Sequence, residues 1–407
     1  MKPAYGGWQE LRDMDGHLRR FAAVQAIFFA AVTAFAISTV SPATAQGTIS
    51  TSAPHAFMID AESGTVLLNV NGDELMAPAS MAKIMTVEVV ANALKEGKLS
   101  LSDEFVVSEN AWRKGGATSG GSTMFAGLNS LISVENLLHG IMIQSGNDAC
   151  IVVAEGMAGT EDVFAQIMTN RARELGLTKS VFKNSTGLPD PDQKVTAREL
   201  AELARHLILT YPDIYSIYSQ TEFEWNGITQ RNRNPLLSMN VGADGVKTGY
   251  TEESGYGLVG SAVQDGRRLI VVVNGLPTAR ERATEAQKLL LWGFRAFEEL
   301  KLFEPGQRVG EVPVYGGAQS AVALRSDDVI KLLIGKGVKR NMKARIVYKG
   351  PLMAPVEQGD RVGVLRIYNN DEVISEAPLF AAESVGKGPL HKRALDAVWE
   401  LSLGWLQ

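Results

Sequence analysis

Strand-like segments stand at both ends of a long helical stretch in this chain, and that order restricts the fold more than any other feature. Residues 55–74 hold two short apolar runs around a Ser-Gly turn, the pattern of a β-hairpin. Residues 256–264 and 267–275 are two more such runs, joined by Asp-Gly, which favours a hairpin strongly. Strands from both ends of the domain should therefore meet in one antiparallel sheet covered by helices, an α+β arrangement.

Six segments show helical periodicity. They are a segment from about Pro78 to Ala93, residues 133–144, residues 151–159, residues 161–176, residues 196–210, and a segment that ends near Phe297. The fifth begins at Thr196 and has Glu199 three positions on, which predicts a capping box. A Gly/Ser-rich loop is expected at 114–123, between the first two helices.

The sequence changes character after about residue 303, where short alternating runs are separated by Gly, Pro and Asn-Asn-Asp. This spacing predicts a small all-β domain over 303–385, following a larger domain over 46–302. Residues 386–407 differ again, because on a helical wheel their apolar side chains share one broad face. Two tryptophans on that face and basic residues beside it are typical of a helix on a membrane surface. A helix docked on its own domain or on a partner explains the same pattern.

Residues 1–45 have the layout of a secretory signal peptide. Two arginines precede an apolar run over 21–40, and Ala-Thr-Ala at 43–45 supplies a cleavage site after Ala45. A permanent membrane anchor is the alternative, since the run approaches the roughly 20 residues that span a bilayer. Threonine and serine within the run favour cleavage. We therefore expect export across the cytoplasmic membrane.

Ser80 and Lys83 stand three apart in "PASMAKIMT", residues 78–86, at an expected helix start. That spacing places both side chains on one face of the helix. A serine hydroxyl is a poor nucleophile until a base removes its proton. A lysine is that base only when its pKa falls well below about 10.4. Apolar neighbours and the positive end of the helix dipole both disfavour the ammonium. An ordinary solvated lysine is the alternative, because Ser-x-x-Lys is common by chance.

Two further motifs follow in order along the chain. Ser145 and Asn147 lie in "SGND" between helical segments, and Lys247, Thr248 and Gly249 form "KTG" on a strand-like run. Together with Ser-x-x-Lys, these are the signature of β-lactamases and penicillin-binding proteins. Each has a structural alternative, since Ser145 could cap the following helix and Lys247 could be a surface residue.

The flanking residues extend the similarity. "GSTMFAG", "SGNDACIVVAE" and "VKTGYT" resemble the low-molecular-mass penicillin-binding proteins that are serine D-Ala-D-Ala carboxypeptidases, peptidase family S11. The resemblance runs from about residue 50 to the end. It implies a β-lactamase/transpeptidase-like catalytic domain, a peptidoglycan stem peptide ending in D-Ala-D-Ala as substrate, and β-lactams as inhibitors. It also implies a periplasmic enzyme attached peripherally to the inner membrane through the C-terminal helix.

The resemblance implies four catalytic residues. Ser80 would attack the carbonyl between the two D-Ala residues, and Lys83 would take the proton of Ser80. Ser145 would pass a proton to the leaving amine, and Asn147 would hydrogen-bond Lys83 or the substrate amide. Water would then hydrolyse the acyl-enzyme.

Four more residues are implied in substrate binding. Lys247 and Thr248 would hold the terminal carboxylate, and Gly249 would leave room for the substrate backbone. The backbone N–H groups of Ser80 and Tyr250 would form the oxyanion hole. Tyr250 departs from the histidine often found there, which leaves substrate preference and deacylation rate open.

Other functions share part of this pattern. A β-lactamase needs fast deacylation, and residues 182–203 show no Glu-x-x-Asn loop of the class A type. Transpeptidases and endopeptidases share all three motifs. A catalytically silent module that binds cell-wall peptides need not keep Ser80, Lys83 and Lys247. The net charge of −5 and the lack of a basic stripe give no reason to expect nucleic acid.

The remaining polar residues have structural interpretations. Asp148 is predicted to be a structural charge at a helix N-terminus, and Cys150, the single cysteine, to be buried packing. The histidines lack metal-ligand spacing, so no metal or other cofactor is expected. Arg280 and Arg282, just after the last strand of the larger domain, are further candidates to bind a carboxylate.

Overall fold

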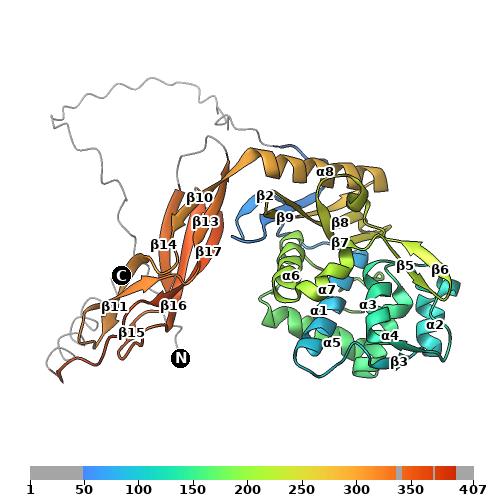
Figure 1. The fold of residues 1–407 in the computed structure, drawn as a ribbon, viewed down its shortest axis with the longest axis horizontal. Coiled ribbons are helices and arrows are strands. Elements are labelled where there is room, and N and C mark those ends of the chain that lie inside the picture. The colour runs from blue at the N-terminus through green and yellow to red at the C-terminus, as the bar shows by residue number, and fades with distance from the viewer. Residues whose placement is uncertain (1–48, 336–341, 370–371, 391–407) are drawn as a thin grey trace, which may run out of the picture. The chain divides into compact units, whose positions relative to one another are not determined.

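The computed structural model of the protein describes residues 49–335, 342–369 and 372–390. The predicted signal peptide and residues 391–407 of the predicted tail helix lie outside these residues. The described chain divides between Glu298 and Glu299 into two compact units (Figure 1). The sequence places this boundary after residue 302, within the strand that joins the two units.

The first unit is built on a five-stranded antiparallel sheet in the order β2-β1-β9-β8-β7. Its strands are β1 (His55–Asp60), β2 (Val66–Val70), β7 (Ala243–Thr251), β8 (Gly255–Gln264) and β9 (Arg267–Leu276). The two predicted hairpins meet through β1 and β9, where Met58 faces Val271. The prediction that strands from both ends of the domain share one sheet is therefore confirmed, and β7 is left at the edge.

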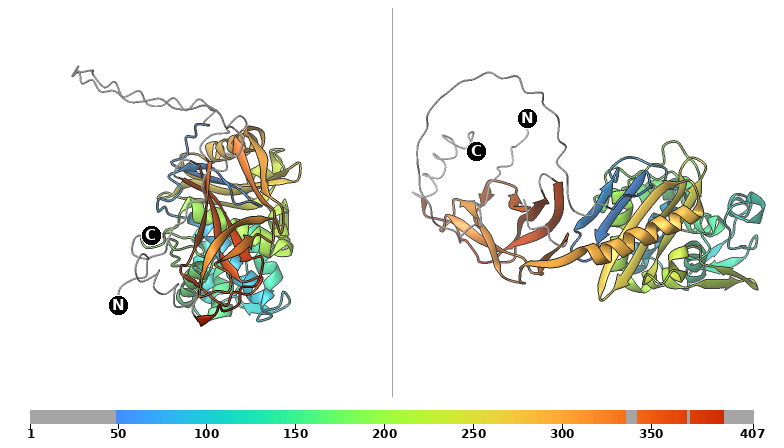
Figure 2. Two further views of the ribbon diagram at one scale, coloured as in Figure 1. Left: turned by 90° about the vertical axis from the view of Figure 1, so that its left-hand side faces the viewer. Right: turned by 90° about the horizontal axis from the view of Figure 1, so that it is seen from above.

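Helices cover both faces of this sheet (Figure 2). They are α1 (Lys83–Lys95), α2 (Glu109–Gly115), α3 (Val134–Met142), α4 (Asn147–Ala158), α5 (Glu161–Glu174), α6 (Ala197–Thr210), α7 (Pro212–Tyr215) and α8 (Ala279–Ala296). The long helix α8 lies along one face, and the others gather on the opposite face. Two short ribbons, β3–β4 (Glu104–Val106, Leu131–Ser133) and β5–β6 (Glu222–Trp225, Ile228–Arg231), lie at the far side of the helices.

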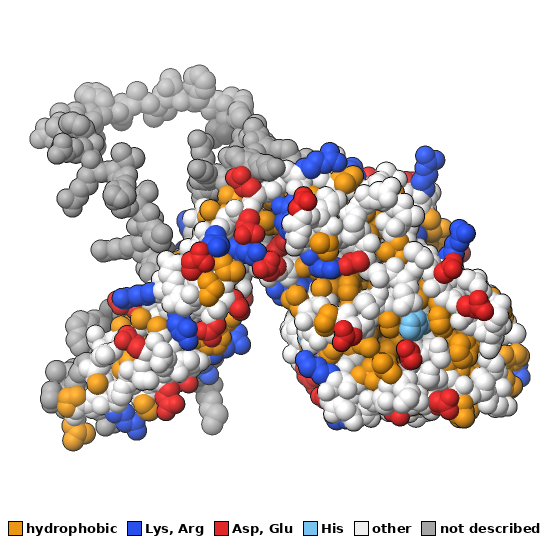
Figure 3. All heavy atoms as spheres, viewed as in Figure 1, with side chains coloured by type: hydrophobic (Ala, Val, Ile, Leu, Met, Phe, Trp, Pro, Cys, Tyr) orange, Lys and Arg blue, Asp and Glu red, His pale blue; other side chains and the backbone are white. Residues whose placement is uncertain are grey.

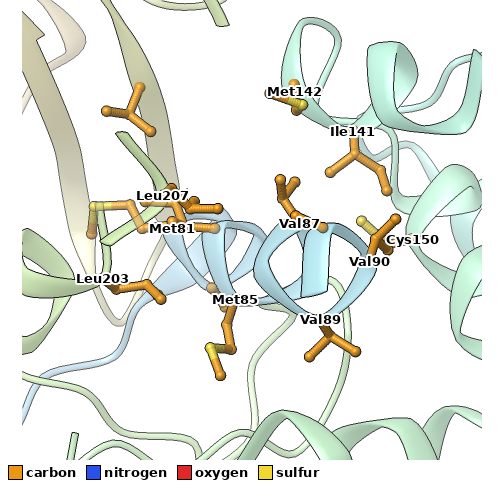
Figure 4. Close-up of a cluster of buried hydrophobic side chains, with 14 of the residues drawn as sticks. Met81, Met85, Val87, Val89, Val90, Ile141, Met142, Cys150, Leu203 and Leu207 are labelled. Atoms are coloured by element: carbon orange, nitrogen blue, oxygen red, sulfur yellow. The ribbon is translucent and has the colours of Figure 1, made fainter. Parts of the chain in front are cut away.

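Helix α1 is the centre of the first unit. Nine consecutive residues, Lys83 to Ala91, are buried, so the helix is enclosed on all sides. Figure 4 shows its apolar side chains between Leu203 and Leu207 of α6 on one side and Ile141, Met142 and Cys150 of α3 and α4 on the other. A charged residue in this helix must therefore find its partners inside the protein.

Glu88 of α1 illustrates this requirement. Its side chain is fully buried, and its carboxylate accepts hydrogen bonds from Nε and Nη2 of Arg171 on α5, at 3.0 and 2.9 Å. The hydroxyl of Tyr211, at the end of α6, donates to the same oxygen at 3.4 Å. The pair therefore ties the central helix to α5 and α6.

The start of α6 only partly follows the sequence prediction. Thr196 is the N-cap, and its hydroxyl accepts a hydrogen bond from the backbone N–H of Glu199 at 3.1 Å. The Glu199 carboxylate does not complete a capping box. It accepts instead from the backbone N–H of Lys179, at 2.8 Å, and from the Ser180 hydroxyl. The residue pattern of a capping box is kept, but the glutamate anchors a distant loop.

The second unit is all-β, as the sequence predicts. Strands β10 (Phe297–Phe303) and β13 (Ile330–Gly335) pair with each other. A six-stranded sheet has the order β14-β16-β17-β12-β11-β15, formed by β11 (Arg308–Tyr315), β12 (Ala321–Arg325), β14 (Met342–Tyr348), β15 (Leu352–Met353), β16 (Arg361–Asn369) and β17 (Glu372–Ala381). Val312, Leu324, Leu332, Leu365 and Leu379 belong to its own hydrophobic core.

The surface of the first unit carries charges of both signs, interspersed over the face shown in Figure 3. No helix within the described residues is both long enough and apolar enough to cross a bilayer.

Arg171→Met should destabilise the first unit by about 3 kcal/mol, because it leaves the buried Glu88 carboxylate without its ionic partner. Arg113→Met is the matched control, since the pair of Arg113 with Glu109 is two-thirds exposed on both sides and such pairs contribute less than about 1 kcal/mol. Melting temperatures of the two variants measure the difference. An equal loss in both would contradict the role given to the buried pair.

Candidate active site

Ser80 and Lys83 lie together at the start of the central helix. Ser80 is in a 3₁₀ turn, Ala79–Ala82, that runs directly into α1, so the three-residue spacing stacks the two side chains. The Nζ atom of Lys83 is 3.0 Å from Oγ of Ser80. Ala79, just before the serine, has a φ of 46°, a conformation that non-glycine residues rarely adopt and that is often found at functional sites.

Lys83 is fully buried and makes two more hydrogen bonds besides that to Ser80. Its Nζ donates to Oδ1 of Asn147 at 2.8 Å and to the backbone carbonyl of Thr186 at 2.5 Å. Burial lowers the pKa of Lys83, and the nearby charge of Arg233 lowers it further. Burial also raises the pKa of the Cys150 thiol to about 12, so this neighbour is neutral at pH 7 and does not stabilise an ammonium.

Ser145 and Lys247 form a second hydroxyl–amine pair. Ser145 lies between α3 and α4 with a φ of 62°, and its Oγ accepts a hydrogen bond from Nζ of Lys247 at 2.8 Å. The N-cap of α4 is Gly146, with no capping bond from a side chain, so the alternative that Ser145 caps this helix is wrong. Lys247 is buried, and burial holds the pKa of Lys247 well below its usual value, with a further contribution from the charge of Lys83.

Gly249 lets β7 approach the nucleophile. A Cβ atom at this position would lie 3.0 Å from the carbonyl oxygen of Pro78 and 3.2 Å from the backbone nitrogen of Ser80. A side chain here would push the strand away from the serine. The glycine is therefore required by the protein's own packing, in addition to the room for substrate that the sequence analysis expects.

Thr248 and Tyr250 alternate with these residues along β7. Thr248 is nearly buried. Tyr250 is 51% exposed, and its ring stacks on that of Tyr256, its cross-strand partner, with 4.1 Å between centroids. The guanidinium of Arg282, on α8, lies 5.6 Å from the Tyr256 ring centroid. Tyr250 of β7, Tyr256 of β8 and Arg282 of α8 thus lie together beside the Lys-Thr-Gly segment.

Asp148 organises the Gly/Ser-rich loop. Its buried carboxylate accepts hydrogen bonds from the Thr123 hydroxyl at 2.6 Å and from the backbone N–H groups of Met124 and Ala126 at 2.9 and 3.0 Å. The predicted structural role is confirmed. The loop in turn lies against Asn147, because a Cβ at Gly121 would come within 2.9 Å of the Asn147 amide nitrogen.

Two residues of the site have no sequence pattern that predicts them. Thr186 contributes only its backbone carbonyl, which any residue carries. Arg233 donates from Nε to the carbonyl oxygen of Gln144 at 2.9 Å, next to Ser145, and its charge lowers the pKa values of Lys83 and Lys247. All three predicted motifs thus enter one network of two buried lysines and two serines.

Two family models match this chain. The model of the D-alanyl-D-alanine carboxypeptidase family, Peptidase S11, matches residues 39–278. The model of the C-terminal domain of penicillin-binding protein 5 matches residues 297–387.

Individual relatives match over most of their length. The chain is 41% identical to D-alanyl-D-alanine carboxypeptidase DacC of Escherichia coli (strain K12), over 84% of this chain and 86% of that protein. It is 37% identical to D-alanyl-D-alanine carboxypeptidase DacF of Bacillus subtilis (strain 168), over 82% and 86%.

Solved structures agree. Penicillin-binding protein 5 from Haemophilus influenzae matches with a TM-score of 0.72 and 36% identity, over 84% of this chain and 99% of that one. Penicillin-binding protein D2 from Listeria monocytogenes, solved with ampicillin bound, matches with a TM-score of 0.53 and 28% identity, over 61% and 100%. The chain has the penicillin-binding protein fold, a helical-plus-sheet domain followed by an all-β domain, and it belongs to the D-alanyl-D-alanine carboxypeptidase family.

Proposed function

We propose that the protein is a serine D-Ala-D-Ala carboxypeptidase that removes the terminal D-alanine from peptidoglycan stem peptides through an acyl-enzyme on Ser80. The observation that carries this proposal is the contact between Ser80 and a fully buried lysine whose pKa is lowered by burial. Family membership supplies the substrate class. No step of the proposed reaction requires a metal or an organic cofactor.

The first half of the reaction forms the acyl-enzyme. Neutral Lys83 takes the proton of Ser80, and Oγ attacks the carbonyl carbon of the penultimate D-Ala. The backbone N–H groups of Ser80 and Tyr250 stabilise the resulting oxyanion. Ser145 then passes a proton to the leaving amine as the peptide bond breaks: it gives up its hydroxyl proton and takes one from the Lys247 ammonium, whose Nζ donates to Ser145 Oγ. This step releases D-alanine and leaves the ester on Ser80. The ammonium of Lys83 meanwhile donates to Asn147 and to the Thr186 carbonyl.

The second half consumes one water molecule. Water attacks the ester carbonyl and loses one proton, which passes through Ser145 to Lys247. The Lys83 ammonium returns its proton to Ser80 as the ester bond breaks, and the shortened peptide leaves with a new carboxyl group, which ionises in solvent. β-Lactams acylate Ser80 by the same attack, with the lactam amide in place of the peptide bond.

Lys247 and Thr248 are proposed to hold the terminal carboxylate of the substrate. In the structure without ligand, burial and the charge of Lys83 keep the pKa of Lys247 low. A carboxylate beside Lys247 favours its ammonium form, so binding of the substrate and protonation of Lys247 are coupled. The open edge of β7 offers backbone groups to an extended peptide, as in strand addition.

The finer localisation is also a proposal. Residues 1–45 are a signal peptide removed on export, residues 46–302 form the catalytic domain, and residues 303–385 form the β-rich domain. The sequence prediction that the amphipathic helix covers residues 386–407 is wrong at its start, because residues 386–388 hydrogen-bond to residues 316–318 of the all-β unit. The proposed membrane-binding segment is therefore residues 391–407, which hold the enzyme on the outer face of the cytoplasmic membrane.

Ser80→Ala should abolish the release of D-alanine from a peptide ending in D-Ala-D-Ala, because no other group supplies the nucleophile. It should also abolish the covalent adduct that intact mass shows after penicillin treatment of the wild type. Ser219→Ala, at an exposed serine outside the three motifs, is the control and should keep both. Equal D-alanine release from the Ser80 variant and the wild type would exclude this mechanism. A rapid return of the wild type to its free mass would favour a β-lactamase.

The rate of acylation by penicillin should fall as the pH falls through the lowered pKa of Lys83, since only the neutral amine accepts the serine proton. The half-maximal rate should therefore lie below the ordinary lysine value of about 10.4. Lys83→Arg, charged at every accessible pH, should lower the rate by a factor on the order of 10² to 10⁴. A half-maximal rate at or above the ordinary lysine value would contradict the assignment of Lys83 as base.

Deletion of residues 391–407 should move the protein from the membrane fraction to the soluble fraction, because the amphipathic face is lost. This deletion keeps residues 386–388, which hydrogen-bond to the all-β unit. The control is the full chain with an appended C-terminal tag of similar length. Removal of this tag should leave the protein in the membrane fraction. Retention of the truncated protein on the membrane, with the signal peptide shown to be cleaved, would contradict the anchor.

A further inference from the structure

The chain segment 183–188 supplies a backbone group to the catalytic lysine, yet it has no helix or strand to hold its shape. Its Thr186 carbonyl accepts the hydrogen bond from Nζ of Lys83. The neighbouring Ser185 carbonyl accepts from the hydroxyl of Thr86, one turn further along α1, at 2.6 Å. The placement of these two carbonyls must therefore come from side chains that bind the segment.

Gln193 binds both ends of this segment. Its Oε1 accepts hydrogen bonds from the backbone N–H groups of Lys183 and Asn184, at 3.0 and 3.2 Å. Its Nε2 donates to the carbonyl oxygen of Leu188 at 3.0 Å. One amide side chain thus closes the segment into a loop with Thr186 at its centre. Gln193 is 2% exposed, so these bonds are shielded from water.

Asn184 fixes the middle of the loop. Its Oδ1 accepts from the backbone N–H and the hydroxyl of Thr186, at 3.3 and 3.0 Å, and from the N–H of Gly187 at 2.7 Å. Its Nδ2 donates to the Leu188 carbonyl, at 3.0 Å, which Gln193 also binds. Both amide side chains therefore hydrogen-bond the Leu188 carbonyl. Asn184 belongs to the loop itself, and Gln193 lies outside it in the sequence.

The loop also packs on the backbone that precedes the nucleophile. Gly187 has a φ of +80°, and a Cβ there would lie 1.9 Å from the carbonyl oxygen of Ala79. A displacement of the loop would therefore reach both Ser80 and Lys83. Gln193 itself hydrogen-bonds the loop and not Ser80 or Lys83.

We infer that Gln193 is a positioning residue for Lys83, because it holds segment 183–188 so that the Thr186 carbonyl accepts a hydrogen bond from the Lys83 ammonium. This inference rests on the proposed role of Lys83 as the base. When Lys83 takes the Ser80 proton, the new charge is buried and must be met by oxygen atoms. The Thr186 carbonyl and Asn147 supply them, and the carbonyl stays in place only while the loop is closed.

The inference predicts the direction in which the pKa of Lys83 changes when the loop opens. A carbonyl that binds the ammonium stabilises the charged form and raises the pKa of Lys83. An opened loop removes that support, so the pKa of Lys83 should fall and the lysine should become a weaker base. The other ionisable groups near Lys83 are Lys247 on β7, Arg233, Cys150 and Asp148 on α4, and Glu161 on α5. Gln193 has no ionisable group, so its replacement leaves all of these charges unchanged.

The test measures the rate of acylation by a fluorescent penicillin across the pH range, using the full chain and rates corrected for the fraction of active enzyme. Gln193→Met, similar in size but unable to make these hydrogen bonds, should lower the plateau about tenfold. It should also move the acid limb of the profile, the range in which the rate falls as the pH falls, to lower pH by about one unit. A shift of this size is expected when one hydrogen bond to a charged group is lost. Asn184→Ala, at a partly exposed position, should move the limb in the same direction, and it carries the test if the Gln193 variant does not fold.

Glu199→Gln is the matched control. Glu199 is also a buried side chain that binds loop backbone, but it holds Lys179 and Ser180, outside segment 183–188. It should lower the melting temperature and leave the acid limb where it is. An acid limb that is unchanged, or moved to higher pH, in both the Gln193 and the Asn184 variants would overturn the inference while the proposed function stands. A wild type that penicillin does not acylate at all would overturn the proposed function and the inference with it.

Discussion

The burial of one lysine at the start of the central helix is the constraint on which the rest of the structure depends. Lys83 has no exposed surface, and its Nζ meets three oxygen atoms, those of Ser80, Asn147 and the Thr186 carbonyl. Burial favours the neutral amine that can accept a proton. The three oxygen atoms accept hydrogen bonds from the ammonium and stabilise it once Lys83 is protonated. A site with only one of these two properties would hold either a permanent cation or an amine that cannot keep its proton.

The fold meets this constraint by enclosing α1 on every side and then closing two segments on the turn that carries the serine. On one side β7 approaches so closely that a Cβ at Gly249 would lie 3.0 Å from the Pro78 carbonyl oxygen. On the other side segment 183–188 approaches through Gly187, whose added Cβ would lie 1.9 Å from the Ala79 carbonyl oxygen. Two glycines far apart in the sequence therefore let both segments pack against Ala79 and Ser80. The strained φ of Ala79 is kept between these two segments.

The sequence predicts those parts of the molecule that depend on side-chain type and spacing. The contact of Ser80 with Lys83 follows from their helical spacing, and the shared sheet follows from the two hairpin patterns. The Thr186 carbonyl could not be predicted, because every residue carries a carbonyl and only the loop geometry aims this one at Lys83. The β5–β6 hairpin was not among the predicted strands, although Asn226-Gly227 at its turn is a strong hairpin pattern. The predicted capping box does not form because of a tertiary contact. The Glu199 carboxylate binds the backbone N–H of Lys179, in a loop before α6, and not the N-terminus of its own helix.

The second buried lysine bears directly on the first. The charge of Lys83 lowers the pKa of Lys247, and the charge of Arg233 lowers the pKa of both lysines. Because repulsion between like charges is mutual, two ammonium groups in this enclosed space are unfavourable. A carboxylate next to Lys247 changes the balance, because it stabilises a proton on Lys247 in particular. The charge on Lys247 then disfavours a proton on Lys83, and Lys83 is left as the neutral amine. Lys247, the proposed carboxylate-binding group, thus also helps to keep Lys83, the proposed base, in its neutral form. This coupling is a physical reason for one site to contain two buried lysines rather than one.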